Sequence, residues 1–357
     1  MNTIYAKIGS DAKENKRIFE AAAEILKQGG LVAFPTETVY GLGGNALDSE
    51  ASAKIYAAKG RPSDNPLIIH IADMKALNEL CSEIPKKALE LAHAFWPGPL
   101  TLIMKKKDIV PNTTTGGLDT VAIRMPENEA ALELIKSSGI YIAAPSANLS
   151  GRPSPTKAEH VMQDMDGRID MIIDGGSGSI GIESTIIDLT EETPVILRPG
   201  YITKEMLEAV VGPVEIDKAV ALGTQTDAAP KAPGMKYRHY APKGEMVIVE
   251  GSLMDKVVDS INRIVKERQK EGICVGVLAT DETADRYRAD VVLSVGERQN
   301  EISISSHLFD VLRTFDDMGV EYILSEGFAR NNVGYAIMNR LLKAAGGKII
   351  NMDESEA

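Results

Sequence analysis

The stretch K-G-R-P-S-D-N-P-L-I-I-H, residues 59–70, places two cations two positions apart on a segment that contains two prolines. Arg61 can bind two phosphate oxygens at once through its planar guanidinium, whereas Lys59 supplies a mobile point charge. Asn65 adds neutral hydrogen-bond donors, and His70 follows in an apolar run. A solvated surface loop would explain a lone K-x-R, but this combination also suits a strongly anionic ligand.

Three other segments place polar groups at the ends of apolar runs. F-P-T-E-T-V-Y-G-L and A-P-S-A-N-L-S-G carry short polar side chains and a tyrosine: Thr36, Thr38, Tyr40, Ser146, Asn148 and Ser150. T-V-A-I-R-M-P holds Arg124 in a strand-like run, where an inward-facing guanidinium needs an anionic partner. Ligands of open α/β sheets commonly bind beyond strand ends, so these segments could share one site. Ordinary turns and caps would explain each of them alone.

A formal G-x-G-x-x-G occurs at Gly176, Gly178 and Gly181, directly after a predicted strand. A dinucleotide site requires a helix to begin there, but the following I-E-S-T-I-I-D-L favours a strand. This context argues against a dinucleotide site and leaves open a glycine-rich turn whose backbone approaches a ligand. The sequence has no P-loop and no nucleophile elbow, and its histidines form no H-E-x-x-H pair.

The 357-residue chain has a net charge of −12. This balance argues against nucleic-acid coating in bulk but is compatible with a small basic pocket. Two distant cysteines, Cys81 and Cys274, fit a reducing compartment and exclude a disulfide framework or a thiolate zinc site. The sequence shows neither a membrane-spanning apolar run nor a signal-peptide core, so we expect a soluble, cytoplasmic protein.

The elements that must position these residues alternate between helix and strand. Apolar spacing predicts a helix over 14–28, capped by Asp11 and Glu14, and a second helix from about 49 to 58. Strand-like runs recur from residue 31 to residue 199. Because so many strands lie close together along the chain, we expect a mixed α/β sheet.

The composition changes after residue 216. The Ala-, Gly- and Pro-rich stretch up to residue 243 has no period and is typical of a linker. Beyond it, strands and helices are predicted at 245–251, 253–270, 273–279, 290–295, 305–318, 322–327 and 333–345. We therefore predict an α/β domain over 1–215, a linker over 216–243 and a smaller Rossmann-like α/β domain over 244–357. The sequence does not indicate what this second domain does.

Taken together, the motifs resemble the YrdC-type threonylcarbamoyl-AMP synthases. The segments F-P-T-E-T-V-Y-G-L, K-G-R-P-S-D-N-P-L-I-I-H, W-P-G-P-L-T, T-V-A-I-R-M-P, A-P-S-A-N-L-S-G, S-T-I-I-D-L and L-R-P-G follow the family's order across residues 15–215. P-G-M-K-Y-R-H-Y-A-P and the unit after it resemble the long form, which has an extra C-terminal domain. The resemblance implies an open, twisted mixed sheet with a concave cationic cavity. It also implies synthesis of L-threonylcarbamoyladenylate and pyrophosphate from L-threonine, bicarbonate or CO2, and ATP.

The resemblance also assigns roles to residues. Lys59 and Arg61 would be catalytic, in contact with phosphates. The implied ATP-binding residues are Arg61, Asn65, Thr120, Ser146, Ser154, Arg198 and Tyr237. The implied threonine-binding residues are Thr38, His70, Arg124, Ala144 and Ser184. Mg²⁺ is expected to accompany ATP, and no metal motif is expected because such ions need few protein ligands.

The implied product serves N6-threonylcarbamoyladenosine formation at position 37 of tRNAs that read ANN codons. The expected partners are the three substrates and a downstream tRNA threonylcarbamoyl-transferase complex, with at most weak direct tRNA contact and no membrane. An RNA-binding module is a competing interpretation, against which the net charge argues. A carbamoyl-transfer maturation factor is another, but two cysteines cannot supply the zinc fingers of such proteins.

The linker combines cations with aromatic residues. No acidic residue occurs between 230 and 243, and the stretch contains Lys231, Lys236, Tyr237, Arg238, His239, Tyr240 and Lys243. A basic linker resting on an acidic domain would explain this composition. We favour a flap that folds over the bound nucleotide and excludes water from a hydrolysable adenylate.

Overall fold

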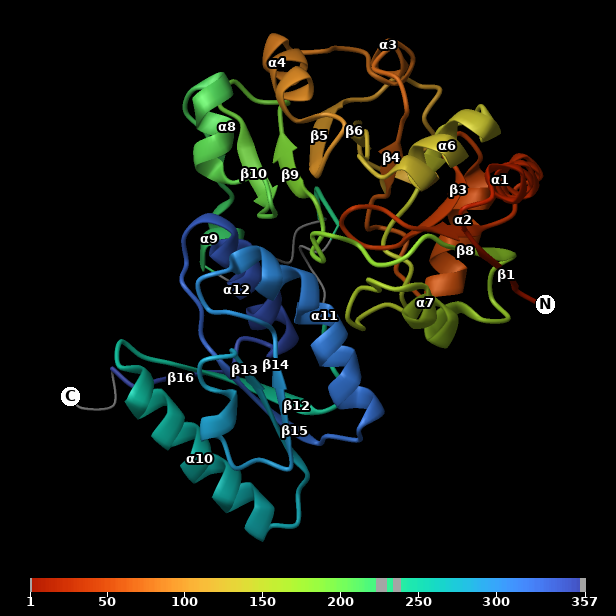
Figure 1. The fold of residues 1–357 in the computed structure, drawn as a ribbon. Coiled ribbons are helices and arrows are strands. Elements are labelled where there is room, and N and C mark those ends of the chain that lie inside the picture. Colours follow the sequence, from red (N-terminus) through yellow and green to blue (C-terminus); the bar gives the residue numbers. More distant parts are fainter. Residues whose placement is uncertain (1, 223–229, 234–238, 354–357) are drawn as a thin grey trace. The chain divides into compact units, whose positions relative to one another are not determined.

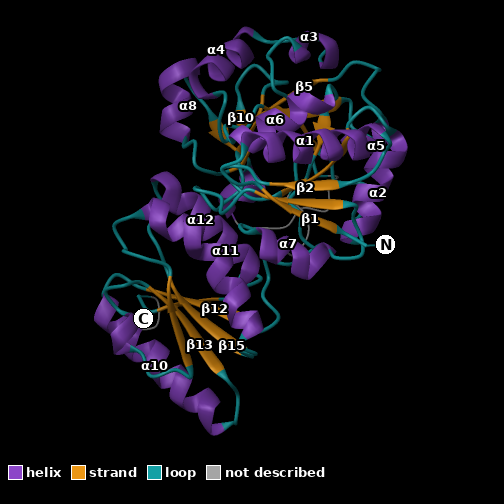
Figure 2. Cartoon of the chain, turned by 45° about the vertical axis from the view of Figure 1, so that its right-hand side comes forward, coloured by secondary structure: helices purple, strands orange, loops and turns teal. Residues whose placement is uncertain are grey.

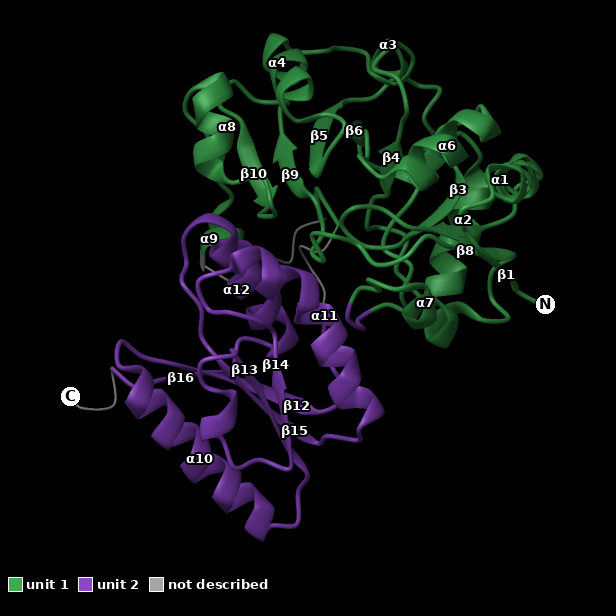
Figure 3. Ribbon diagram, viewed as in Figure 1, with its two compact units in different colours: residues 1–150, 154–237 green, residues 151–153, 238–357 purple. Residues whose placement is uncertain are grey.

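The computed structural model describes residues 2–222, 230–233 and 239–353. The chain divides into two compact units (Figures 1 and 3): residues 1–150 with 154–237, and residues 151–153 with 238–357. Each unit contains a sheet, helices and a hydrophobic core of its own.

The first unit alternates strands and helices, as the sequence predicts. Its strands are β1 (Ile4–Lys7), β2 (Val32–Phe34), β3 (Gly41–Asn45), β4 (Ile68–His70), β5 (Leu100–Lys105), β6 (Thr120–Arg124), β7 (Ile142–Ala143), β8 (Met171–Asp174), β9 (Thr185–Asp188), β10 (Val195–Arg198) and β11 (Glu215–Ile216). Its helices are α1 (Ala12–Lys27), α2 (Ser49–Lys59), α3 (Ala76–Leu80), α4 (Lys86–Phe95), α5 (Asn112–Thr115), α6 (Glu129–Ser138), α7 (Ala158–Met165), α8 (Lys204–Val211) and α9 (Lys218–Leu222). β11 and α9 lie where the sequence predicts the linker to begin.

Within the described residues, these strands form one 11-stranded sheet in the order β1-β8-β2-β3-β7-β4-β6-β5-β9-β10-β11. The pairs β4–β6 and β5–β9 are parallel, whereas β3–β7, β4–β7 and β5–β6 are antiparallel. The prediction of a mixed sheet is therefore confirmed.

Helices α1 and α6 pack together over one half of this sheet. Asp11 caps α1 by accepting hydrogen bonds from the amides of Lys13 and Glu14, so the predicted N-cap is confirmed. Phe19 and Leu26 of α1 and Leu134 of α6 form a core with residues of β2, β7 and β8. Amphipathic packing of this kind, rather than propensity, provides most of a helix's stability.

Strand periodicity divides the centre of the sheet into two faces. Ile69 in β4 and Val121 and Ile123 in β6 enter the large core that also contains side chains of α2 and α4. Side chains alternate along a strand, so Ile68 and Ala122 point to the opposite face, where they belong to a separate apolar cluster. The same alternation places His70 and Arg124, two residues further along their strands, on that opposite face.

The second unit is a smaller α/β domain. Its elements are β12 (Glu245–Glu250), α10 (Met254–Lys270), β13 (Val275–Ala279), the 3-10 helix η1 (Ala284–Arg286), β14 (Val291–Ser294), α11 (Glu301–Asp317), β15 (Tyr322–Glu326), α12 (Asn332–Ala344) and β16 (Ile349–Asn351). All its pairings are parallel, in the order β14-β13-β15-β12-β16. In Figure 2, α10 lies on one side of the sheet and α11 and α12 on the other. The predicted Rossmann-like architecture is confirmed, although β16 was not predicted.

Across the described part of the chain, no helix combines the length and apolar character needed to cross a bilayer.

Candidate functional site

Arg124 lies at the end of β6, where the fold buries its guanidinium. The residue is 4% exposed. Its Nε donates a hydrogen bond to the carbonyl oxygen of Gly98 (3.2 Å), and Nη1 donates to Oγ1 of Thr38 (2.9 Å). The predicted anionic partner is Glu37, whose Oε1 lies 2.6 Å from Nη2. The motifs around Thr38 and Arg124, far apart in sequence, thus meet.

The turn that carries Thr38 is held by its own side chains and by the glycine-rich segment. Thr36 Oγ1 donates to the carbonyl oxygen of Val39 (2.6 Å) and accepts from the amide of Thr38 (3.2 Å). Gly181 donates its amide to the carbonyl oxygen of Thr38, and a Cβ on Gly178 would lie 2.6 Å from that oxygen. The glycine-rich segment therefore packs closely against this turn of the protein, and it leads into β9, not into a helix. The approach of its backbone to a ligand stays a prediction.

His70 lies beside Arg124, because β4 and β6 are parallel and these two residues are paired in register. Its ring meets Phe34 edge-on, with centroids 6.0 Å apart, and Nδ1 donates to the carbonyl oxygen of Ile68 (3.1 Å). Burial, assisted by the charge of Arg124, lowers the pKa of His70 to about 3. The imidazole is therefore uncharged at neutral pH, and Arg124 provides the positive charge at this position.

Lys59 is the last residue of α2, and Gly60 ends the helix in the left-handed conformation (φ 61°). The Nζ of Lys59 donates to the carbonyl oxygens of Ser146 (2.5 Å) and Asn148 (2.6 Å). Ser146 Oγ in turn donates to Oδ1 of Asn148 (2.6 Å). Lys59 therefore joins α2 to the polar loop that follows β7.

Arg61 closes the turn between α2 and β4. Its Nη2 donates to the carbonyl oxygens of Asn65 (3.2 Å) and Pro66 (3.0 Å). Arg61 is 8% exposed and Lys59 is 3% exposed. The interpretation of these cations as a solvated surface loop is therefore wrong.

A further group of predicted residues lies around β9 and β10. Arg198 donates through Nε to the carbonyl oxygen of Ser184 (3.0 Å) and through Nη2 to its Oγ (3.1 Å). The Ser184 hydroxyl also lies 2.7 Å from that of Thr101. Ser154 Oγ donates to Oε1 of Glu183 (2.5 Å), which brings the loop after β7 to the start of β9.

Backbone hydrogen bonds connect these groups. Tyr40 donates its amide to the carbonyl oxygen of Pro155 and accepts from the amide of Ala147, so the Thr38 turn adjoins the loop bound by Lys59. The amide of Thr185 donates to the carbonyl oxygen of Pro99, next to the glycine that Arg124 contacts. Arg124, Lys59 and Arg198 therefore belong to neighbouring segments of one region.

The three remaining predicted residues, Thr120, Ala144 and Tyr237, lie in different parts of the chain. Thr120 is half-buried at the start of β6, at the opposite end of that strand from Arg124. Ala144 is buried just after β7 and donates its amide to the carbonyl oxygen of Ile68. Tyr237 lies outside the described residues. The predicted cationic cavity, as a shape, stays a prediction.

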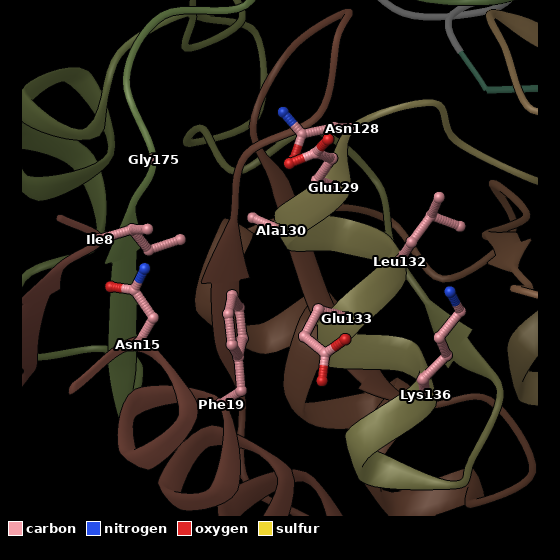
Figure 4. A pocket seen from close by; sticks show the side chains of 10 residues that line it. All are labelled: Ile8, Asn15, Phe19, Asn128, Glu129, Ala130, Leu132, Glu133, Lys136 and Gly175. Carbon is pink, nitrogen blue, oxygen red and sulfur yellow. The ribbon is translucent and has the colours of Figure 1, made fainter. Parts of the chain in front are cut away.

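A cavity of about 650 Å³ opens elsewhere in the first unit (Figure 4). It lies between α1 and α6, near the ends of β1 and β8, and its lining includes Phe19, Asn128, Glu133 and Gly175. None of the predicted site residues that the structure describes lines it. The cavity is therefore separate from the region around Arg124.

The second unit has a buried polar cluster at the carboxyl end of its sheet. Glu326, fully buried at the end of β15, accepts hydrogen bonds from the hydroxyl groups of Tyr287 (2.6 Å) and Thr283, and it pairs with Arg298. This carboxylate is well supplied with partners from its own unit. Such a cluster is typical of a structural anchor.

Comparisons with known proteins cover both units. Residues 24–200 match the Sua5, YciO and YrdC family, described as telomere recombination, and residues 202–346 match the C-terminal domain of threonylcarbamoyl-AMP synthase. The chain is 50% identical to the threonylcarbamoyl-AMP synthase of Bacillus subtilis, over 97% of this chain and 98% of that protein. It is 53% identical to the synthase of Pyrococcus abyssi, over 93% and 95%. The crystal structure of P. abyssi Sua5 complexed with L-threonine matches with a TM-score of 0.92 and 50% identity, over 99% of this chain and 100% of that one.

Proposed function

The chain belongs to the threonylcarbamoyl-AMP synthase family, and we propose that it joins L-threonine, bicarbonate or CO2, and ATP into L-threonylcarbamoyladenylate with release of pyrophosphate. The resemblance inferred from the motifs is confirmed by the 50% identity over 97% of the chain. Because an adenylyl group is transferred to a carbamate, the reaction class is that of a nucleotidyltransferase. The product supplies N6-threonylcarbamoyladenosine formation at position 37 of tRNAs that read ANN codons.

One observation of the fold supports the threonine site most directly. Arg124 is a buried guanidinium whose Nε and Nη1 are held by Gly98 and Thr38. A guanidinium fixed in this way is suited to a carboxylate, which it can bind with two parallel hydrogen bonds. Arg124 would bind the α-carboxylate of threonine, with the uncharged His70 packed beside it.

The ATP site would include Lys59 and Arg61. A carbamate and a triphosphate bring several negative charges together, and two like charges 4 Å apart repel by about 4 kcal/mol at an effective dielectric of about 20. The two cations offset this repulsion as a carbamate oxygen attacks the α-phosphorus and the bond to pyrophosphate breaks. Positioning and charge stabilisation carry the rate, so no protein nucleophile is required.

The remaining implied residues complete the two sites. Arg198 would bind the nucleotide, and Ser184, which hydrogen-bonds to Arg198, would contact threonine, so this pair would couple the two substrates. Asn65, Thr120, Ser146, Ser154 and Tyr237 are proposed for ATP, and Ala144 for threonine.

Mg²⁺ is proposed only as the companion of the ATP phosphates. In the described part of the chain, no group of three or more His, Cys, Asp or Glu side chains could hold a metal ion. Magnesium bound to nucleotide phosphates keeps several water ligands and needs few ligands from the protein. MgATP can therefore bind without a cluster of protein ligands. The ion would neutralise phosphate charge, while Lys59 and Arg61 position the reacting groups.

We further propose that the product passes to a tRNA threonylcarbamoyl-transferase complex in the cytoplasm. A net charge of −12 favours at most weak direct contact with tRNA. An RNA-binding module would instead retain tRNA in a salt-sensitive manner without turnover.

Pyrophosphate release by the purified full-length chain tests the proposal. Release should require threonine, bicarbonate and ATP together, and omission of any one should abolish it. The matched control replaces L-threonine with D-threonine, which carries the same groups in the wrong geometry. Release that is independent of threonine, or salt-sensitive tRNA binding without release, would contradict the proposed function.

A further inference from the structure

Glu37 places a buried carboxylate directly beside Arg124. Its Oε1 lies 2.6 Å from Nη2 of Arg124, and the two side chains are 6% and 5% exposed. The contact is an ion pair without the alignment of a hydrogen bond. Neither carboxylate oxygen of Glu37, nor Nη2 of Arg124, has a hydrogen-bond partner within the described residues. The carboxylate of Glu37 can therefore still accept hydrogen bonds, and the adjacent Nη2 of Arg124 can still donate them.

The backbone around Glu37 fixes the position of this carboxylate. The amide of Ile180 donates to the carbonyl oxygen of Glu37 (2.8 Å). On either side, Thr36 and Thr38 are bound to each other through their hydroxyl groups (2.8 Å). Glu37 therefore extends from a turn that hydrogen bonds hold in place, and this turn keeps the carboxylate buried.

A buried carboxylate that only stabilises a fold is usually hydrogen-bonded by that fold, because an unsatisfied buried charge is costly. Glu326 in the second unit is of this kind, since it is contacted by Thr283, Tyr287 and Arg298. Among the residues that the structure describes, the carboxylate of Glu37 has only its ion pair with Arg124. Open acceptors on a rigid, buried carboxylate indicate a ligand that donates hydrogen bonds.

The chemistry of the pair identifies the ligand class. An α-amino acid carries an ammonium group and a carboxylate on neighbouring carbons, which match an adjacent carboxylate and guanidinium. We propose that Glu37 accepts a hydrogen bond from the α-ammonium group of threonine while Arg124 binds the α-carboxylate. The proposal rests on the proposed function, because that function places threonine at Arg124. Glu37 is then the residue that selects threonine over the same acid without its amino group.

A structural role for Glu37 makes a different prediction. If the carboxylate only neutralised and oriented Arg124, its removal would change the affinity of every carboxylate ligand by the same factor. If it binds the ammonium group, its removal weakens only ligands that carry that group. The ratio of two affinities therefore separates the roles.

Isothermal titration calorimetry on the full chain measures this ratio with L-threonine and with 3-hydroxybutanoate, which lacks only the amino group. The wild-type protein should bind threonine at least about tenfold more tightly, as expected for a charge-assisted hydrogen bond. Glu37→Gln should lower the ratio by about tenfold or more by weakening threonine binding, with 3-hydroxybutanoate binding unchanged or tighter. Glu127→Gln, which removes an exposed carboxylate near Arg124 in sequence, is the matched control and should leave the ratio unchanged.

An equal change in both affinities in Glu37→Gln, which leaves the ratio unchanged, would overturn the assignment of Glu37 alone. Failure of the wild-type protein to bind threonine would overturn the proposed function itself. If the variant does not fold, wild-type titrations with threonine, threoninamide and 3-hydroxybutanoate decide the question. Loss of either charged group should then weaken binding at least about tenfold, and 3-hydroxybutanoate binding equal to that of threonine would overturn the assignment.

Discussion

The ammonium group of Lys59 lies 2.6 Å from the carbonyl oxygen of Asn148, which joins the last turn of α2 to the loop after β7. A second carbonyl oxygen, that of Ser146, accepts from the same nitrogen. A lysine that lies on a solvent-exposed loop and only binds phosphate would contribute to catalysis but not to stability. Because Lys59 is buried and bound to this loop, it also supports the shape of the site.

Lys59→Met should therefore lower both activity and stability. Pyrophosphate release should fall by about 100-fold or more, because the cation that we propose for phosphate binding is lost. The free energy of unfolding should fall by about 1–3 kcal/mol, because two carbonyl oxygens lose a charged donor. Urea denaturation and a pyrophosphate assay measure the two effects.

Lys54→Met is the matched control, since Lys54 lies on the same helix, is exposed and also donates to a carbonyl oxygen, that of Gly29. It should leave the rate unchanged. A Lys59→Met protein of wild-type stability would show that the contacts with the loop contribute nothing.

His70 should make the protein less stable in acid. Its pKa is lowered to about 3 in the folded state, against 6.5 for the unfolded chain, so the unfolded state binds the extra proton between these values. Stability should therefore fall as pH drops below about 6.5. Between pH 7.5 and pH 5 this one group should cost about 2 kcal/mol of the free energy of unfolding.

Urea denaturation of His70→Gln at both pH values measures that contribution. The variant should lose about 2 kcal/mol less than the wild-type protein between pH 7.5 and pH 5. His93→Gln, at an exposed position of α4, should behave as the wild type. An identical acid response in the wild-type protein and His70→Gln would show that His70 is not held uncharged by the fold.

Gly178→Ala should disturb the Thr38 turn from outside. The added Cβ would lie 2.6 Å from the carbonyl oxygen of Thr38, so one of the two segments must move. Threonine binding should weaken by about tenfold or more, because small displacements of positioning groups are costly. Calorimetry with threonine measures this, and Gly9→Ala, where the added Cβ would meet nothing within 4 Å, should bind normally. Normal threonine affinity in Gly178→Ala would separate this turn from the threonine site.

The sequence predicted the helices and strands well where periodicity is strong. The helix predicted over 253–270 is α10, and the predicted strand 322–327 is β15. The predictions were wrong at the start of one helix and missed one short strand. The helix predicted over 305–318 begins at Glu301, because Asn300 caps it with a side chain that accepts from Ser303. β16 was missed because three residues near the end of the chain carry no clear period.

The candidate site was predictable in its residues more than in its contacts. The motifs indicated that Arg124 needs an anionic partner, but they could not name Glu37, because no periodicity connects a turn to a distant strand. The only available signal was a carboxylate between two threonines in P-T-E-T. Likewise, the prolines around Arg61 indicated a stiff turn, whereas its burial depends on packing that only the fold provides.

The last prediction concerns residues 230–233, the described start of the stretch that we propose as a flap. Ala232 is fully buried in an apolar cluster of the first unit with Ile68, Ile103, Ala122, Ile186 and Leu197. The next residue, Pro233, accepts from Nη1 of Arg198 (3.5 Å). This part of the predicted linker therefore packs on the face of the sheet that carries Arg124. It is not a flexible tether.

Ala232→Asp should release this segment, because a carboxylate cannot be buried in an apolar cluster without a cost of several kcal/mol. Trypsin cleavage after Lys231, whose side chain is 60% exposed, should become faster. Pyrophosphate release should fall by about tenfold or more if docking keeps water from the adenylate. Ala221→Asp makes the same change at an exposed position of α9 and should alter neither measurement. Faster cleavage with a wild-type rate would mean that docking of the segment is not needed for catalysis, and the flap hypothesis would then be wrong.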